Sequence, residues 1–71
     1  MKPYSERTRQ ILEDAAAIAK EMGHSYIGSE HMLIAMAKDQ QSIGGAALKR
    51  LRVSPYVIEK TVRNMLNEAT P

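Results

Sequence analysis

The chain of 71 residues contains no cysteine, no phenylalanine and no tryptophan, and only three tyrosines. The absence of cysteine excludes disulfides and thiolate ligands for a metal, and it fits a reducing compartment. No apolar run approaches the roughly 20 residues that span a bilayer, and the N-terminus opens no signal-peptide core. We therefore expect a cytoplasmic protein that is neither secreted nor held in a membrane. Its core has to be built from Ile, Leu, Val, Ala and Met.

The chain also has no strong excess of charge of either sign. Ten basic and eight acidic residues give a net charge of +2, which is too balanced to require nucleic acid or an anionic membrane. The longest basic cluster, Lys49, Arg50 and Arg52, is more typical of a solvated helix face than of a phosphate-binding patch. A chain this short forms a single domain, residues 1–71, that buries only about 60% of its unfolded surface. Such a domain gains stability from tight helix packing, from docking to a neighbour or from self-association.

Apolar side chains recur with a 3.6-residue period over four segments, and no stretch alternates with a period of two. The sequence therefore predicts an all-α fold of four helices, over residues 6–22, 29–38 and 43–51 and from residue 55 to the point where the chain frays at 67–71. Ser5, Ser29 and Ser54 are expected to cap helix N-termini, and Pro55 suits a first helical position. Gly23 suits the left-handed residue that ends a helix.

The second predicted helix is apolar on almost every side over residues 32–37. Such a helix is usually central, with neighbours on several sides, or it has a partner that covers one of them. In the third predicted helix, paired glycines at 44 and 45 allow another backbone to approach closely. The side chains expected to face inward there are Ile43, Ala46, Ala47, Leu48 and Leu51.

No constellation of residues indicates catalysis. His24 and His31 lie seven residues apart across a turn, which matches no helical pair of metal ligands. A histidine beside a helix end more often bonds to the backbone there. The glycine pair at 44–45 lacks the lysine and the preceding strand of a phosphate-binding loop. We therefore expect no metal, no cofactor and no enzymatic activity, which leaves a binding function.

Two helix starts are the candidate binding features, one at Ser5 and one at Ser29 and Glu30. Each offers free backbone N–H groups, a hydroxyl and the positive end of a helix dipole, which together favour an anion. Ordinary helix capping is the more common explanation of the same residues, so these features alone do not establish a binding site.

Residues 23–33 read GHSYIGSEHML, and the first helix opens with Tyr4, Ser5 and, two residues later, Arg7. In these features the chain resembles the Clp N-terminal repeat, the amino-terminal module of ClpA- and ClpC-type AAA+ unfoldases. Members of that family typically show G-H-x-x-[IV]-G-[TS]-E-H-[IL]-L at this place. The segments 43–48 and 51–54 add support, so the resemblance covers nearly the whole chain and is closest to the ClpC type. It implies a compact unit of four helices that forms half of a double domain.

The resemblance also implies a function. The family's module recruits protein substrates and adaptors for the attached ATPase, and ClpC-type modules of Gram-positive bacteria recognise phosphorylated arginine. The positions that match that site are Ser5, where the family usually has threonine, and Glu30. A helix start with a hydroxyl suits the phosphoryl group, and a carboxylate suits the guanidinium. Ser29 belongs to the same helix start as Glu30, and Arg7 adds charge near Ser5. This expectation requires Ser5 and Glu30 to lie close enough to share one small ligand.

Three further expectations remain open. Because the chain holds one repeat, we expect it to form a homodimer or to dock on a second repeat. A DNA-binding helix-turn-helix over residues 48–58, with Lys60 and Arg63 near phosphates, is an alternative, although Arg52 stands where a glycine is usual and the net charge is low. A purely structural dimerisation module is the other alternative.

Overall fold

All the secondary structure is helical in the computed structural model, which describes residues 4–69. The helices are α1 (Glu6–Glu21), α2 (Ser29–Lys38), α3 (Ile43–Arg50) and α4 (Pro55–Ala69). The predicted all-α fold of four helices is confirmed, and the first three helices end within a residue of their predicted limits. The fourth helix continues through residue 69, although the sequence predicts fraying from residue 67. Residues 70–71, which belong to the same prediction, lie outside the described residues.

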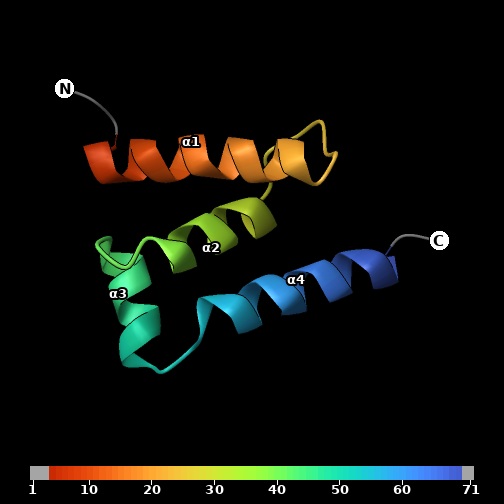
Figure 1. Cartoon of the computed structure of the whole chain (residues 1–71). Coiled ribbons are helices and arrows are strands. Elements are labelled where there is room, and N and C mark those ends of the chain that lie inside the picture. The colour runs from red at the N-terminus through yellow and green to blue at the C-terminus, as the bar shows by residue number, and fades with distance from the viewer. Residues whose placement is uncertain (1–3, 70–71) are drawn as a thin grey trace.

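The four helices are stacked around α2 (Figure 1). α1 and α2 form an antiparallel pair, α3 crosses at the end of α2, and α4 returns on the other side of α2. α2 packs directly against α1, α3 and α4, whereas no other pair of helices within residues 4–69 is closely packed. The prediction that the second helix is central is therefore confirmed.

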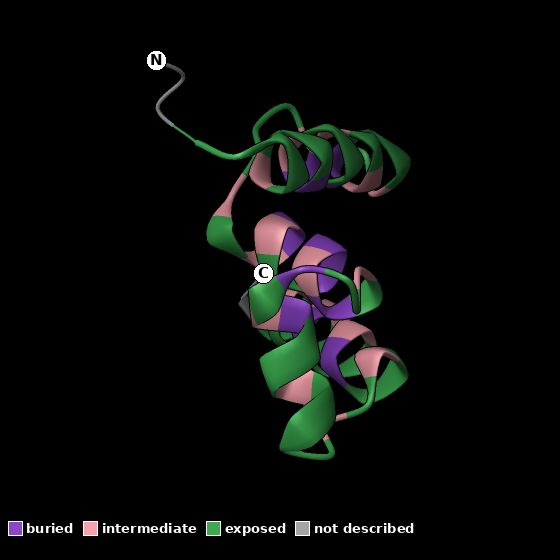
Figure 2. Cartoon of the chain, turned by 90° about the vertical axis from the view of Figure 1, so that its left-hand side faces the viewer, coloured by how far each residue is buried: buried purple, intermediate pink, exposed green. Residues whose placement is uncertain are grey.

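The core consists of two clusters that meet at α2, and Figure 2 shows the buried positions between the stacked helices. One cluster joins α2 to α4 and the other joins α2 to α1. The buried members are Ile34, Ala37, Ile58 and Val62 in the first cluster, and Ile11, Ala15 and Ala35 in the second. A helix that supplies both clusters needs apolar side chains on opposite sides, which explains the apolar run over residues 32–37.

Most of the predicted helix ends are confirmed by their hydrogen bonds. Ser5 Oγ accepts the backbone N–H of Thr8 at 3.1 Å, and Ser54 Oγ accepts that of Tyr56 at 3.2 Å. Gly23 has a φ of 78°, the left-handed conformation expected after α1. Arg52 adopts the same conformation after α3, with a φ of 61°, and it is the only non-glycine residue of the described chain to do so.

The predicted inward face of α3 is wrong. Ile43 is 88% exposed and Leu51 is 72% exposed, and Ala46 and Ala47 are exposed as well. Of the five side chains expected in the core, only Leu48 packs against it, and only partly.

The glycine side of α3 faces α2 instead. Gly45 is buried, and a Cβ atom there would lie 2.5 Å from the carbonyl oxygen of Met36 and closer still to that of Asp39. Ser42 caps the helix on the same side, where its buried hydroxyl accepts the N–H of Gly45 at 3.0 Å. Because the backbones touch here, the orientation of α3 follows the small residue and leaves the larger apolar side chains outside.

Candidate functional site

The turn between α1 and α2 ends in a cap that differs from the predicted one. Gly28 is the N-cap residue and Ser29 is already the first residue of α2, so the expected cap by Ser29 is wrong. The cap hydrogen bond comes from His31, whose Nδ1 accepts the backbone N–H of Gly28 at 2.8 Å. An acceptor three residues into the helix that reaches back to the N-cap is one half of a capping box. The other half, a side-chain oxygen at position 28 that accepts an N–H of the first turn, is missing because residue 28 is glycine.

Three rings gather around this cap. His31 is fully buried, and its Nε2 lies 2.7 Å from Nδ1 of His24. The ring of Tyr26 is stacked on His24 with centroids 5.3 Å apart, and it meets His31 edge-on at 5.4 Å. The expectation that a histidine here bonds to the backbone is confirmed for His31. Within residues 4–69 no group of three His, Cys, Asp or Glu side chains is arranged to hold a metal ion.

Glu30 lies in the first turn of α2, where its carboxylate folds back over Gly28. A Cβ atom at position 28 would lie 2.8 Å from Oε1 of Glu30, so glycine leaves the space that the carboxylate occupies. Hydrogen bonds donated by the backbone N–H of Glu30 and by the hydroxyl of Tyr26 hold the pKa of the Glu30 carboxyl below its usual range. The hydrogen bond between Tyr26 and Glu30 also raises the pKa of the Tyr26 hydroxyl. Glu30 is therefore a carboxylate at neutral pH, held at the positive end of a helix.

Ser5 and Arg7 lie at the other end of the α1–α2 pair. Arg7 donates a hydrogen bond to Oε1 of Gln41 at 3.0 Å and forms an ion pair with Asp39 at 3.4 Å. It thereby ties the start of α1 to the connection between α2 and α3. Ser5 Oγ is 3.0 Å from the hydroxyl of Thr8, in addition to its cap bond.

The structure does not bring Ser5 and Glu30 together within one chain. The two residues begin antiparallel helices, so they lie at opposite ends of the pair (Figure 1). α1 has 16 residues, which at 1.5 Å per residue separates these ends by about 24 Å. Phosphoarginine carries its phosphoryl group directly on the guanidinium, so one such ligand does not reach both residues of the same chain.

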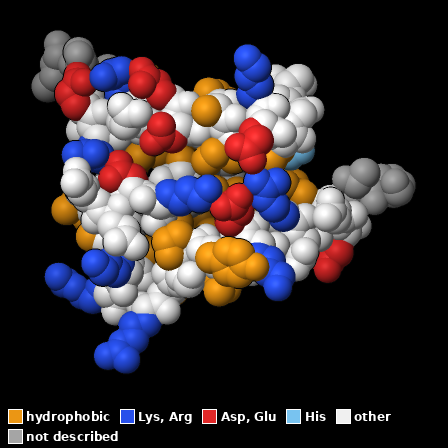
Figure 3. All heavy atoms as spheres, viewed as in Figure 1, with side chains coloured by type: hydrophobic (Ala, Val, Ile, Leu, Met, Phe, Trp, Pro, Cys, Tyr) orange, Lys and Arg blue, Asp and Glu red, His pale blue; other side chains and the backbone are white. Residues whose placement is uncertain are grey.

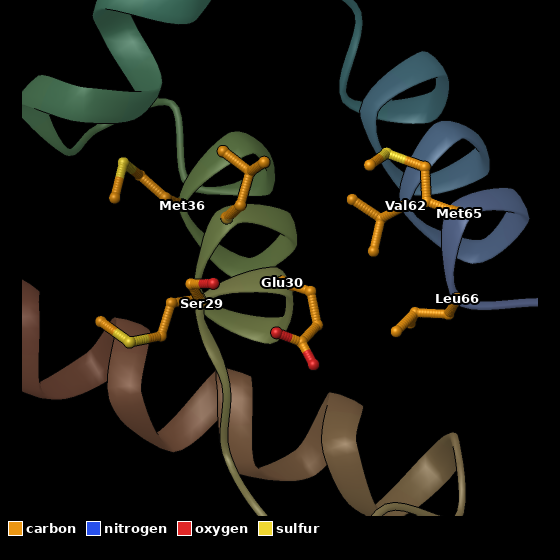
Figure 4. Close-up of a pocket in the computed structure, with 8 residues that line it drawn as sticks. Ser29, Glu30, Met36, Val62, Met65 and Leu66 are labelled. Carbon is orange, nitrogen blue, oxygen red and sulfur yellow. The ribbon is translucent and has the colours of Figure 1, made fainter. Parts of the chain in front are cut away.

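An apolar groove with a volume of about 650 Å³ lies between α2 and α4. In Figure 4 the side chains of Val62 and Leu66 on α4 point toward α2, and Glu30 lies on the facing side of α2. Ser29 and Met36 on α2 and Met65 on α4 also line the groove. Apart from Ser29 and Glu30, every lining residue is apolar: Met32, Leu33, Met36, Val62, Met65 and Leu66. The groove thus places apolar contact surface beside one carboxylate.

Sequence reasoning did not identify this groove. The apolar period of the fourth helix is visible in the sequence, but it does not reveal that Met65 is 62% exposed and lines the groove. Leu33 on α2 is 39% exposed. The one usable signal was that the second helix has more apolar positions than its three neighbours in a small fold can cover.

Comparison with known proteins shows the family of this chain. The family model described as "Clp repeat (R) N-terminal domain" matches residues 3–71. The chain belongs to the Clp N-terminal repeat family. The Clp repeat of this chain is 32% identical over 68 residues to the chaperone protein ClpC1, chloroplastic, of Oryza sativa subsp. japonica, covering 96% of the chain and 7% of the relative. It is 31% identical over 67 residues to the chaperone protein ClpC, chloroplastic, of Pisum sativum, covering 94% and 7%.

A third relative is named after ClpA and not after ClpC. The Clp repeat is 32% identical over 66 residues to the "ATP-dependent Clp protease ATP-binding subunit ClpA homolog" of Porphyra purpurea, covering 93% of the chain and 8% of the relative. The chain thus spans less than a tenth of the length of these relatives. No solved structure matches it. Across the described residues, no helix of the Clp repeat is long and apolar enough to cross a bilayer. The comparisons support a module of the Clp chaperone–protease type.

Proposed function

We propose that this Clp repeat is a non-catalytic recognition module that binds apolar segments of substrate or adaptor proteins in the groove between α2 and α4. The groove itself carries the proposal, because apart from Ser29 and Glu30 its walls are apolar and they are open to the surface. Three of its six apolar lining residues are methionines, at 32, 36 and 65. Methionine side chains are flexible and polarisable, and they suit surfaces that accept varied partners.

The negative charge of Glu30 at one end of the groove favours partner segments that carry a basic residue. Glu30 is the only charged residue that lines the groove, and its lowered pKa keeps it ionised. A segment with apolar side chains and one basic residue, placed to meet this carboxylate, therefore complements the groove best. Such a segment fits in extended or helical form, because the contacts come from side chains.

The test uses a permanently unfolded protein, reduced and carboxymethylated lactalbumin, as the probe. We expect it to bind the parent chain and to bind at least tenfold more weakly to a Leu33→Ser, Met65→Ser double variant. Both side chains are exposed in part, so the double variant should keep its helical content. Val57→Ser is the matched control, because Val57 is 53% exposed on α4 but does not line the groove. Equal affinity for the parent and the double variant, or a parent that does not bind, contradicts the proposal.

Phosphoarginine recognition requires two copies of the repeat in this geometry. We propose that the guanidinium pairs with Glu30 of one copy while the phosphoryl group meets Ser5 and the α1 start of another. Both features are on the surface, and each supplies the chemistry that one half of the ligand needs. The reason for two copies is the separation of about 24 Å between the two helix starts of one chain.

Mixed variants test this arrangement in a titration with phosphoarginine. Glu30→Gln keeps the size of the side chain and removes its charge, and Ser5→Asp keeps an N-cap while it repels the phosphoryl group. Each variant alone should lose binding. An equal mixture should recover about a quarter of the parent's sites, since half of the random pairs contain one intact site of two. No recovery, with both variants folded, rules out a shared site.

Self-association is the partner arrangement that the remaining apolar surface favours. Ile43, Leu51 and Tyr56 are each at least 70% exposed near α3, away from the groove, and a small domain gains from covering such side chains. We propose a homodimer, or docking on a second Clp repeat, through this surface. This contact is separate from the shared phosphoarginine site, because Ser5 lies beside Ile43 whereas Glu30 lies at the opposite end of the α1–α2 pair. Sedimentation should show concentration-dependent dimers that Ile43→Ser weakens. A parent chain that stays monomeric into the high micromolar range contradicts this arrangement.

Two other functions make predictions that differ from those of the recognition module. A helix-turn-helix would use the basic residues around α3, which Figure 3 shows at the lower left of the molecule. A helix-turn-helix predicts that the chain retards duplex DNA of mixed sequence in a gel-shift assay at low salt, whereas the recognition module predicts no retardation. A purely structural module predicts dimers that bind neither the unfolded protein nor phosphoarginine.

A further inference from the structure

Gly28 does not have to be glycine for the sake of its backbone. Its φ of −108° and ψ of 177° are extended values that any residue adopts, whereas Gly23 needs the left-handed region with its φ of 78°. Gly45 is required for another reason, because a Cβ atom there would meet backbone. At position 28 the three atoms nearest to an added Cβ all belong to the carboxyl group of Glu30. This glycine therefore leaves space for a side chain, and the turn itself does not require it.

Tyr26 contributes a hydrogen bond to the same carboxylate. Its hydroxyl donates to Glu30, and two further rings hold the tyrosine ring in place. It is stacked on the ring of His24 with an interplanar angle of 7°, and it meets the ring of His31 at an angle of 61°. His31 is fully buried and is bonded to the N–H of Gly28 at 2.8 Å, so this cluster is anchored in the fold. The rings thus hold a hydroxyl where the carboxylate accepts its hydrogen.

Together these features form a seat for the Glu30 carboxylate, which consists of the space over Gly28, the hydroxyl of Tyr26 and the backbone N–H of Glu30. The positive end of the α2 dipole favours the negative charge at the same place. Glu30 lies on the side of α2 that faces α4 (Figure 4), and it is the only charged residue that lines the groove. A long side chain that is not held samples several rotamers. The seat instead keeps the charge in one position beside the groove.

We propose that Gly28 and Tyr26 are positioning residues that make the groove specific for partner segments with a basic residue. The inference rests on the proposed function, because it concerns what the groove between α2 and α4 selects. Immobilising one flexible side chain during binding weakens binding by about two- to tenfold. The seated carboxylate has lost this freedom before a partner arrives, so a lysine or arginine side chain meets a charge that is already in place.

Two forms of an unfolded protein measure this specificity. One is reduced and carboxymethylated lactalbumin, and the other is the same protein with its lysines acetylated, which removes their charge. The preference of the chain is the ratio of its affinities for the unmodified and the acetylated form. We expect Gly28→Ala and Tyr26→Phe each to lower this preference by about two- to tenfold. The affinity for the acetylated form should stay within about twofold of the parent, because the apolar walls are unchanged.

Two further variants serve as controls. Glu30→Gln removes the charge and sets the lowest preference that loss of the seat can produce. Tyr4→Phe is matched to Tyr26→Phe, because both tyrosines are 51% exposed and Tyr4 does not line the groove; it should keep the preference of the parent. Circular dichroism checks that every variant keeps its helical content. If Glu30→Gln lowers the preference while Gly28→Ala and Tyr26→Phe both retain it, the inference is overturned and the proposed function stands.

Carbon-13 spectra of the Glu30 carboxyl group test the seat without a partner. The hydrogen bonds of the seat hold the pKa of Glu30 below its usual range. The carboxyl signal should therefore titrate at a higher pH in Gly28→Ala and in Tyr26→Phe than in the parent. An unchanged titration in both variants overturns the inference, because neither residue then places the carboxylate. A parent that binds neither form of lactalbumin contradicts the proposed function, and the specificity inferred from it falls as well.

Discussion

Replacing Gly45 by alanine should destabilise the fold far more than the same change at Gly44. At position 45 the new methyl group would meet backbone: the carbonyl oxygen of Met36 at 2.5 Å and that of Asp39 at a shorter distance. Backbone atoms of two elements then have to move. The Asp39 oxygen also accepts the N–H of Ser42 at 3.1 Å and its hydroxyl at 2.7 Å, so the movement strains the α3 cap as well.

The expected size follows from these contacts. Overpacking typically costs about 1–3 kcal/mol, and a lost hydrogen bond at the cap adds about 1 kcal/mol. The better helix propensity of alanine offsets about 1 kcal/mol. The net loss is about 1–3 kcal/mol, a large part of the roughly 4–10 kcal/mol expected for a chain of this length. At Gly44 the new methyl group meets only the flexible side chain of Met36, with Cγ at 2.9 Å.

Urea unfolding followed by circular dichroism at 222 nm measures both variants against the parent. Gly44→Ala should stay within about 1 kcal/mol of the parent in either direction. If Gly45→Ala proved as stable as Gly44→Ala, α3 would not rest on α2 through its backbone, and the orientation described for α3 would be wrong.

Three further substitutions test other parts of the fold by the same urea assay. Ser42→Ala should lose about 2 kcal/mol, because it leaves the N–H of Gly45 without its acceptor in a buried place; an unchanged midpoint contradicts the cap. Arg52→Gly should gain about 1 kcal/mol, because glycine adopts the left-handed conformation without strain; a loss would mean that the Arg52 side chain stabilises the fold. Hydrogen bonds from Lys38 and Arg63 lower the pKa of Glu59, so the stability that this carboxylate contributes is lost as the pH falls below about 4.3. The loss of unfolding free energy between pH 5 and 3 should therefore be smaller in Glu59→Gln than in the parent, by up to about 1 kcal/mol. The same loss in both proteins would show that these ion pairs contribute nothing to stability.

The sequence specified what depends on neighbouring residues. Ser5, Gly23 and Ser54 act within three or four residues of themselves, so their roles in beginning or ending helices were readable and are confirmed. The central place of α2 was also readable, because a helix that is apolar on opposite sides needs neighbours on both.

What depends on distance through space was not readable. α3 turns its glycine to α2 because Gly45 lets two backbones meet, and periodicity alone favoured the larger apolar side chains. The cap of α2 comes from His31 and not from Ser29, because Ser29 is already inside the helix and the imidazole of His31 reaches back to the N–H of Gly28. Ser5 and Glu30 share a type of environment, a helix start, but antiparallel packing puts those starts at opposite ends.

The groove between α2 and α4 is tested most directly through its methionines. Labelling the methionine methyl groups with carbon-13 gives separate signals for Met32, Met36 and Met65, which line the groove, and for Met22, which packs outside it. On addition of reduced and carboxymethylated lactalbumin, the three groove signals should shift with a common affinity while that of Met22 stays in place. Shifts at Met22 with the groove methyls unchanged would show that the Clp repeat recognises proteins elsewhere.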